Sequence, residues 1–306
     1  MSPRPISVAI LGTGPIADRL AARIDEGHDL RLTGRITTAQ PVPEGTDCVV
    51  YAPTLAEITG DATKDVLALL REGHDVVSAI PLDGQVPIAD IRDACRAGNS
   101  TFHATSAFQT ALATRLVRSL SEVTRDIRRV ELEEELDLPD AGVYPWKTLG
   151  DTGIGIEDIE AARSAVSAVA GFYEAGLRVL DEAVFAGAAE TDATPAVSVQ
   201  VLTTDAGIVE KVIVNRDFGP RLSYRSTWIA RTGDGAPLRY RIVTATDTAK
   251  GSTTVQFHGA DGLHPADHLT CVGILDALRP IHESDAGIAH RDLSITSLMS
   301  DDRLAT

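Results

Sequence analysis

The N-terminal third of the chain alternates between continuous apolar runs and segments in which apolar side chains recur at helical spacing. Ile6–Leu11 is apolar along almost its whole length, as in a strand buried on both faces, whereas Pro15–Asp25 gathers its apolar residues on one side of a helix. The same alternation predicts further strands and helices at Leu30–Ile36, Asp47–Ala52, Thr63–Glu72, Asp75–Ile80, Ile88–Ala97 and Thr101–Ala104. This order predicts βαβ units and a parallel sheet of the Rossmann type.

The second part of the chain has a different pattern. Within Ile127–Leu138 a mainly apolar set, Val130, Leu132, Glu134 and Leu136, alternates with an acidic set, Glu131, Glu133, Glu135 and Asp137, which predicts a long strand with one acidic face. An Ala-rich stretch, Ile156–Ala189, predicts one or two helices, and a last helix is expected over Pro265–Leu278. Further strands are expected at Val197–Thr203, Ile208–Phe218, Ser223–Arg231, Leu238–Thr246 and Ser252–His258. The fold class is therefore α/β, with an N-terminal Rossmann-type parallel sheet domain and a C-terminal α+β domain with a mixed or antiparallel sheet.

We place the dinucleotide-binding domain at residues 1–122 and a substrate-binding and oligomerisation domain at 123–264. The segment 265–306 is expected to pack back on the first domain. The alternating strands between Val197 and His258 leave one sheet face to be covered, so we expect a homodimer or a higher homo-oligomer.

A glycine-rich turn follows the first predicted strand and opens the first helix. It consists of Gly12, Thr13, Gly14, Pro15, Ile16 and Ala17. Gly12 permits a tight turn, Gly14 has no side chain to block a pyrophosphate, and Ala17 is small enough for close packing of helix on strand. The helix N-terminus offers amide groups and the positive end of its dipole to phosphate. We interpret this turn as a dinucleotide site; the alternative is a purely structural turn.

The end of the second strand bears on the choice between NAD and NADP. NAD-binding domains commonly carry an acidic residue there for the ribose 2′-hydroxyl. This chain has Arg35, Thr37 and Thr38 instead, which suit a 2′-phosphate. The sequence therefore favours NADP(H); the alternative is that Arg35 is an ordinary exposed arginine at a strand end.

Charge and composition exclude several partners. The formal net charge of −16 argues against nucleic acid and is compatible with a cationic substrate. No stretch reaches the roughly 18 to 20 apolar residues that span a bilayer, so we expect no membrane partner and a cytoplasmic protein. The three cysteines, Cys48, Cys95 and Cys271, are too widely spaced for a zinc motif or a disulfide framework.

Several segments resemble dihydrodipicolinate reductase and, more closely, the 2,4-diaminopentanoate dehydrogenases and native amine dehydrogenases. They are the turn at 12–17 and the stretches 47–54, 69–78, 94–105, 275–281 and 286–288. The resemblance implies a nicotinamide cofactor, hydride transfer at a C=N carbon and an oligomer. It also implies cofactor contacts from the loops after the third, fourth and fifth strands, at Ala52, Pro53, Thr54, Ala79, Ile80, Pro81 and Thr105.

Two departures from that family limit the substrate. The His-His…Lys signature of dihydrodipicolinate reductase is replaced by Glu133-Glu134-Glu135, so we do not expect that reaction. The carboxylate that amine dehydrogenases usually carry after the fourth strand is displaced to Asp83, behind Ile80-Pro81-Leu82. Reductive amination from free ammonia is therefore in doubt.

Three titratable residues are the candidates for proton transfer or substrate binding. His103 ends the fifth strand at the carboxyl edge of the sheet; the alternative is a buried histidine with a satisfied hydrogen bond. Tyr144 precedes Lys147, which would lower its pKa; the alternative is loop packing. Asp137 ends an acidic row that could attract an ammonium or iminium group, or could form a solvated face.

His264 and His268 have a metal-compatible spacing, but no third ligand is evident and we predict no metal. The sequence thus predicts an NADP-dependent oxidoreductase, either an imine reductase or an amine dehydrogenase-like enzyme, acting at a C=N or C–N carbon of a small molecule. Reduction of a carbonyl on the same fold, or a non-catalytic NADP-binding regulatory protein, are the alternatives.

Overall fold

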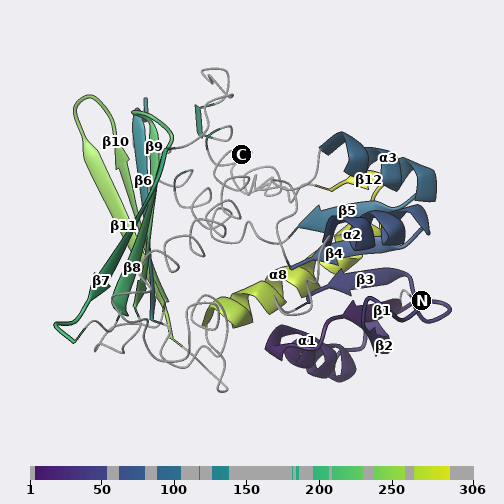
Figure 1. Cartoon of the computed structure of the whole chain (residues 1–306). Helices are drawn as coiled ribbons and strands as arrows, with labels where there is room; N and C mark the ends of the chain where they lie inside the picture. Colours follow the sequence, from purple (N-terminus) through teal and green to yellow (C-terminus); the bar gives the residue numbers. More distant parts are fainter. Residues whose placement is uncertain are drawn as a thin grey trace, which may run out of the picture.

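The computed structural model describes residues 4–53, 62–79, 88–104, 126–137, 196–206, 209–229, 238–258 and 265–289, together with positions 117, 181, 184 and 185. These residues form two β-sheets that lie apart in the molecule, with one long helix extending between them (Figure 1). Among the helices described, none combines the length and the hydropathy that crossing a bilayer requires.

Sheet A has six strands and is parallel throughout. In spatial order its strands are β12 (Gly287–Ile288), β5 (Thr101–Ala104), β4 (Asp75–Ser78), β3 (Cys48–Tyr51), β1 (Ile6–Leu11) and β2 (Leu30–Ile36). Every side chain of β1 and β3 is buried, because helices cover both faces of the sheet. The predicted Rossmann-type parallel sheet is therefore confirmed.

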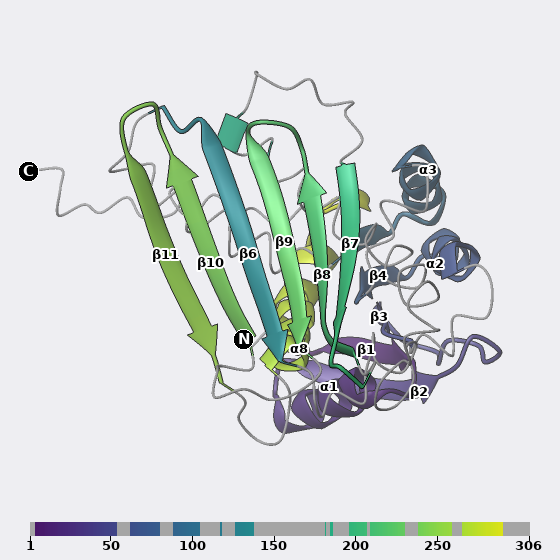
Figure 2. The same ribbon diagram turned by 60° about the vertical axis from the view of Figure 1, so that its left-hand side comes forward.

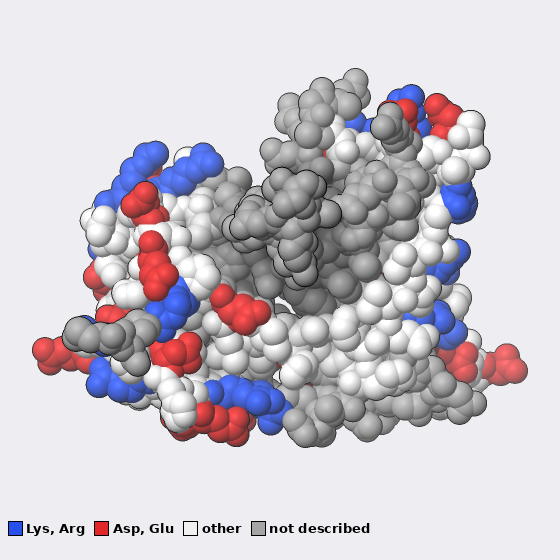
Figure 3. Space-filling view, turned by 180° about the vertical axis from the view of Figure 1, so that it is seen from behind, with Lys and Arg blue, Asp and Glu red and all other residues white. Residues whose placement is uncertain are grey.

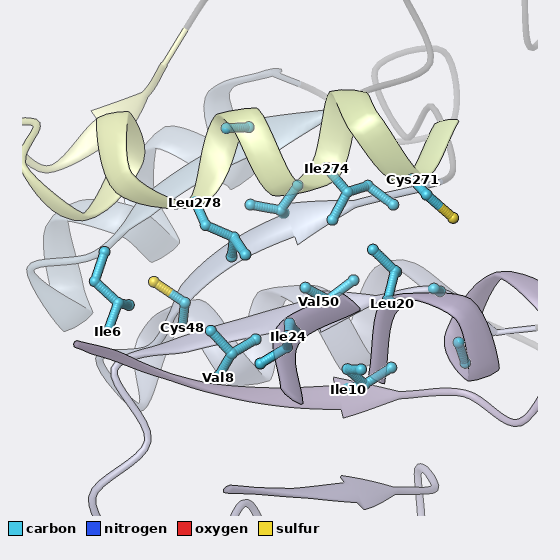
Figure 4. Packing of buried hydrophobic residues seen from close by; sticks show 14 of the residues in the cluster. Ile6, Val8, Ile10, Leu20, Ile24, Cys48, Val50, Cys271, Ile274 and Leu278 are labelled. Atoms are coloured by element: carbon cyan, nitrogen blue, oxygen red, sulfur yellow. The ribbon is translucent and has the colours of Figure 1, made fainter. Parts of the chain in front are cut away.

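The helices of sheet A are divided between its two faces. On one face lie α1 (Pro15–Glu26) and α8 (Pro265–His282), and on the other lie α2 (Ala62–Arg71) and α3 (Ile88–Gly98). In α1, Leu20 and Ile24 are buried, one helical turn apart. Figure 4 shows these two side chains meeting Val8 and Val50 of the sheet, with Ile274 and Leu278 of α8 arriving from above. The C-terminal part of the chain thus completes the core of the N-terminal part.

Sheet B also has six strands, drawn side by side in Figure 2. Their spatial order is β11 (Lys250–Phe257), β10 (Leu238–Ala245), β6 (Arg129–Asp137), β9 (Leu222–Ile229), β8 (Val209–Asp217) and β7 (Ala196–Thr203). The β6–β9 pair is parallel and the other pairs are antiparallel, so the sheet is mixed, as predicted. Its inner face carries a separate apolar core that includes Trp228 and reaches Leu269 of α8.

The elements differ from the sequence-based prediction chiefly near the C-terminus. The helix expected to end at Leu278 continues through Pro280 to His282. Pro280 lies so close to the helix end that few intrahelical hydrogen bonds follow it, and the Ser284 hydroxyl donates to its carbonyl oxygen over 2.6 Å. The short segment Gly287–Ile288, for which no strand was predicted, pairs with β5 as the edge strand β12. Most of the predicted helical region 156–189 lies outside the described residues.

Candidate active site at the carboxyl edge of sheet A

The glycine turn joins β1 to α1 at the carboxyl edge of sheet A. Gly12 has φ +140°, and a Cβ atom there would lie 2.1 Å from the carbonyl oxygen of Ala52, so only glycine fits. Its amide donates to the carbonyl oxygen of Ile36 over 3.0 Å. The turn is therefore held against both neighbouring strands, β3 and β2, which fixes where α1 begins.

Gly14 is the N-cap residue of α1 and Pro15 is the first residue of the helix. Within the described part of the chain no side chain caps this end, which leaves the first-turn amides available to a ligand. Gly14 is buried, whereas Thr13 and Pro15 are exposed, Ile16 is partly exposed and Ala17 packs into the core. A buried glycine before an uncapped helix N-terminus is an arrangement that can bind a pyrophosphate group.

The loops after β3 and β4 begin beside this turn. Hydrogen bonds continue the sheet beyond its strands, from the Ala52 amide to Leu11 over 2.9 Å and from the Ala79 amide to Tyr51 over 2.9 Å. Ala52, Pro53 and Ala79 therefore lie along one edge with Gly12, where ligands bind in open parallel sheets. Thr54, Ile80, Pro81 and Thr105 lie outside the described residues.

The end of β2 carries an ion pair that the sequence did not reveal. Nη1 of Arg35 lies 2.7 Å from Oδ1 of Asp18, which belongs to the first turn of α1. The Asp18 side chain is mostly exposed and the Arg35 side chain is 38% exposed, and the pair places the guanidinium at the corner where the glycine turn meets β2. Thr37 is engaged locally, because its amide donates to Oε1 of Gln40 over 2.9 Å, and Thr38 is exposed.

His103 is buried on β5, and its Nδ1 lies 2.8 Å from the carbonyl oxygen of Ala289, just after β12. A carbonyl oxygen only accepts, so Nδ1 carries the proton and Nε2 of the neutral ring is an acceptor. The histidine thus fastens the C-terminal segment to the sheet. Asp137 is the last residue of β6 and stands opposite Ile229; its side chain, and all of Tyr144, lie outside the described residues.

The acidic face of β6 proves to be paired with arginines. Arg129, Arg241 and Arg239 lie 2.9, 3.0 and 2.7 Å from the carboxylates of Glu131, Glu133 and Glu135, respectively. These pairs are on the outer, partly exposed face of sheet B. On the face of the molecule seen in Figure 3, acidic and basic side chains of the described residues are likewise interspersed. The row is therefore neutralised locally and does not form a strong field for a cationic substrate.

A buried carboxylate was missed as a functional candidate. Glu134 is only 1% exposed on the inner face of sheet B. It accepts hydrogen bonds from the hydroxyls of Tyr224, Ser226 and Tyr240, over 2.5, 2.6 and 2.7 Å. The buried guanidinium of Arg216 lies 5.2 Å over the Tyr224 ring. The sequence signal was a glutamate on the apolar side of the alternation, which demands partners when buried.

No protein-family model and no curated protein matches the sequence. Solved structures do match. The amine dehydrogenase of Mycobacterium smegmatis aligns with a TM-score of 0.62 at 13% identity, over 93% of this chain and 94% of that one. A putative myo-inositol dehydrogenase of Sinorhizobium meliloti aligns with a TM-score of 0.55 at 12% identity, over 93% and 91%. GenD2 of gentamicin A biosynthesis, in complex with NAD, gives 0.50 at 12% identity, over 92% and 86%.

These similarities establish that the chain has the fold of such dehydrogenase structures, over 93% of its length in the alignments with the amine and inositol dehydrogenases. They extend to enzymes named for amines and for inositols, at identities that establish the fold alone. The closer likeness to the dihydrodipicolinate reductase group therefore stays a prediction from the sequence.

Proposed function

We propose that this chain is an NADPH-dependent oxidoreductase that reduces, or in the reverse direction oxidises, the C=N or C–N carbon of a small amine or imine. The observation that carries the proposal is the Gly12–Ala17 turn. It joins a fully buried strand to an uncapped helix N-terminus at the carboxyl edge of a parallel sheet. That geometry fits a dinucleotide, because glycine at 14 leaves room for phosphate beside the helix dipole.

The choice of NADPH rests on the corner between α1 and β2. Arg35 supplies a guanidinium that can form charge-assisted hydrogen bonds with a 2′-phosphate. The paired Asp18 carboxylate keeps that guanidinium at the corner when no cofactor is bound. GenD2, a structure of the same fold, contains NAD, which supports a nicotinamide cofactor without deciding its 2′-substituent.

The bound cofactor would supply a hydride equivalent, and the protein would supply position and a proton. The turn at Gly12–Ala17, with Ala52 and Ala79 beside it, would hold the dinucleotide along the sheet edge. His103 and Tyr144 are the proposed sources of the proton, and Asp137 is proposed to contact a cationic nitrogen. The similarity to an amine dehydrogenase and the net charge of −16 support a substrate with basic nitrogen.

A second candidate, reduction of a carbonyl or oxidation of an alcohol, is supported by the similarity to a putative inositol dehydrogenase. The two candidates differ at the atom bonded to the reacting carbon. A carbonyl substrate needs no carboxylate for a cationic nitrogen, so Asp137 would then be dispensable.

The test combines cofactor binding with turnover. Purified protein is titrated with NADPH and NADH by fluorescence, and cofactor oxidation is then followed with matched pairs of cyclic imines and ketones of equal size. We expect tighter binding of NADPH and oxidation only with imines. Turnover with ketones alone would support the second candidate, and cofactor binding without turnover across the panel would indicate a regulatory protein.

A further inference from the structure

Three side chains with different metal-binding atoms meet at the amino edge of sheet A. Cys48 and Asp75 are the first residues of β3 and β4 and stand directly opposite each other in the parallel register. His282 is the last residue of α8, which covers this face of the sheet. Sγ of Cys48 lies 4.0 Å from Oδ2 of Asp75, and Nδ1 of His282 lies 3.0 Å from the same oxygen.

We propose that Cys48, Asp75 and His282 form a binding site for one zinc-type divalent cation. The site would offer a thiolate sulfur, a carboxylate oxygen and an imidazole nitrogen, and water would complete four-coordination. These are the three ligand types that Zn²⁺ takes in proteins. The proposal is independent of the proposed oxidoreductase function, because the site lies at the edge of the sheet opposite the glycine turn.

The distances are close to those of a coordinated ion. The three ligand atoms lie within 4.8 Å of one another. Tetrahedral bonds of the usual lengths would separate sulfur from oxygen by about 3.5 Å and oxygen from nitrogen by about 3.3 Å. The observed 4.0 and 3.0 Å are within about 0.5 Å of these values. Sulfur and nitrogen, which lie within 4.8 Å of each other, would approach to about 3.6 Å by side-chain rotation on binding.

The surroundings orient the carboxylate and balance charge. The Thr101 amide donates to Oδ1 of Asp75 over 2.8 Å, which directs Oδ2 toward the sulfur and the imidazole. A divalent cation bound by one thiolate, one carboxylate and a neutral imidazole would be electrically balanced in this buried position. On binding, the thiol proton of Cys48 would leave to solvent and the cation would take its place on sulfur.

A cation can reach the proposed site past the C-terminal end of α8. Cys48 has no exposed surface, and Figure 4 shows its sulfur directed toward α8 beside Leu278 and Ile6. The side chain of Asp75 is 14% exposed and that of His282 is 39% exposed, so a cation can reach the site from the His282 side. The alternative is a hydrogen-bonded chain from the thiol through the carboxylate to the imidazole that only fastens α8 to the sheet.

The two interpretations differ in metal binding. The full chain, treated with chelator under reducing conditions, is titrated with Co²⁺ and the absorbance is recorded. We expect one equivalent of Co²⁺ per chain, with the near-ultraviolet charge-transfer band of a cobalt–thiolate bond, and displacement of cobalt by Zn²⁺. Cys48→Ser should abolish the band. His282→Gln should weaken cobalt binding by more than the roughly 10- to 100-fold that loss of an outer-shell partner costs.

Two matched controls separate the site from general effects. Cys271→Ser removes another buried thiol and His74→Gln another histidine; both should keep the band and the affinity. Absence of a cobalt–thiolate band in the wild type, its survival in Cys48→Ser or its equal loss in Cys271→Ser would each overturn the proposal. If Cys48→Ser does not fold, His282→Gln tests the proposal, because the His282 side chain is at an exposed helix end and its replacement should not prevent folding. Unchanged cobalt affinity in His282→Gln would overturn the proposal.

Discussion

The guanidinium of Arg35 at the end of β2 lies 2.7 Å from the carboxylate of Asp18 in the first turn of α1. If the glycine turn binds a dinucleotide as we propose, this contact puts one positive and one negative group near the ribose 2′-substituent. A 2′-phosphate would be attracted by the first group and repelled by the second, whereas a free ribose 2′-hydroxyl could donate to the second. Arg35 therefore favours NADPH and Asp18 favours NADH, and substituting each residue in turn measures its effect on cofactor preference.

We predict that Arg35→Ala costs about 1.5 to 3 kcal/mol of NADPH binding, the range of a charge-assisted hydrogen bond, and hardly changes NADH binding. Arg31→Ala is the matched control, since Arg31 lies on the same strand and donates to the Ser7 hydroxyl over 2.8 Å. Fluorescence titration measures the affinity of each variant for NADPH and for NADH. Equal affinity of the wild type for the two cofactors would contradict the assignment of NADPH.

Removing the partner charge should act the other way. Asp18→Asn keeps the size of the side chain and removes the negative charge near the 2′-phosphate. We expect it to tighten NADPH binding by up to about 1 kcal/mol, because the pair is exposed and screened by water. A loss of NADH affinity in this variant, with NADPH unaffected, would instead show that Asp18 holds a ribose hydroxyl.

Gly14 tests the turn as a ligand site. Its backbone, at φ −80° and ψ 179°, is open to any residue, so Gly14→Val should fold while its side chain occupies the pyrophosphate position and abolishes cofactor binding. Gly27→Ala, at the other end of α1, is the control and should bind normally; a Cβ atom there would meet nothing closer than 3.5 Å. Normal cofactor binding by a folded Gly14→Val protein would show that the turn has a purely structural role.

The Glu134 cluster should dominate the stability of sheet B. Glu134→Ala would leave three buried hydroxyls without their shared acceptor, and we expect a loss of about 3 to 5 kcal/mol in the free energy of unfolding. Glu135→Ala, next along the strand, breaks only a partly exposed pair with Arg239 and should cost about 1 kcal/mol or less. Urea unfolding monitored by tryptophan fluorescence compares them, since Trp228 lies in the same core.

The sequence predicted the strands of both sheets except β12, and the glycine turn, because these depend on local periodicity; β12 is too short to show any. It did not predict the partners of charged residues, which depend on register. Glu134 meets Ser226 and Tyr240 because β6 lies between β9 and β10, an order that adjacency in sequence does not imply. Cys48 and His282 approach Asp75 from 27 and 207 positions away, so no spacing rule could have joined them. The last helix was predicted to stop at Leu278, whereas α8 continues to His282 and buries Ile281 against sheet A.

The raised pKa values of two buried thiols predict how thiol labelling and stability depend on pH. Burial, and then the Asp267 carboxylate, raise the pKa of Cys271 from 9.0 to about 11; burial, and then Asp75, raise that of Cys48 further. At pH 8 the thiolate fraction of Cys271 is about 100-fold below that of an ordinary cysteine, so thiol reagents should react only after denaturation. Because the unfolded chain loses the Cys271 proton first, the contribution of Cys271 to stability is full below about pH 9 and is lost as pH rises through about 11. Rapid labelling of the folded, metal-free protein at pH 8 would contradict it.

The last prediction concerns the proton that accompanies hydride transfer. His103 holds its Nδ1 proton on the Ala289 carbonyl oxygen, so it can donate to a substrate only from Nε2 and only as an imidazolium. A neutral phenol, such as that of Tyr144, can donate its hydroxyl proton directly. We expect one of the two changes, His103→Gln or Tyr144→Phe, to lower kcat by about 10² to 10⁴ and to leave NADPH affinity nearly unchanged.

In His103→Gln the side-chain amide can still donate to the Ala289 carbonyl oxygen but cannot act as an acid. This variant therefore distinguishes a structural role of His103 from acid catalysis. If His103 only fastens β12 to β5, His103→Gln should keep kcat, whereas His103→Ala should lower the melting temperature with the rate per folded molecule unchanged. Full kcat in both His103→Gln and Tyr144→Phe, on a confirmed substrate, would exclude both as the acid. The proton would then come from water or from an iminium substrate, and catalysis would rest on holding cofactor and substrate together.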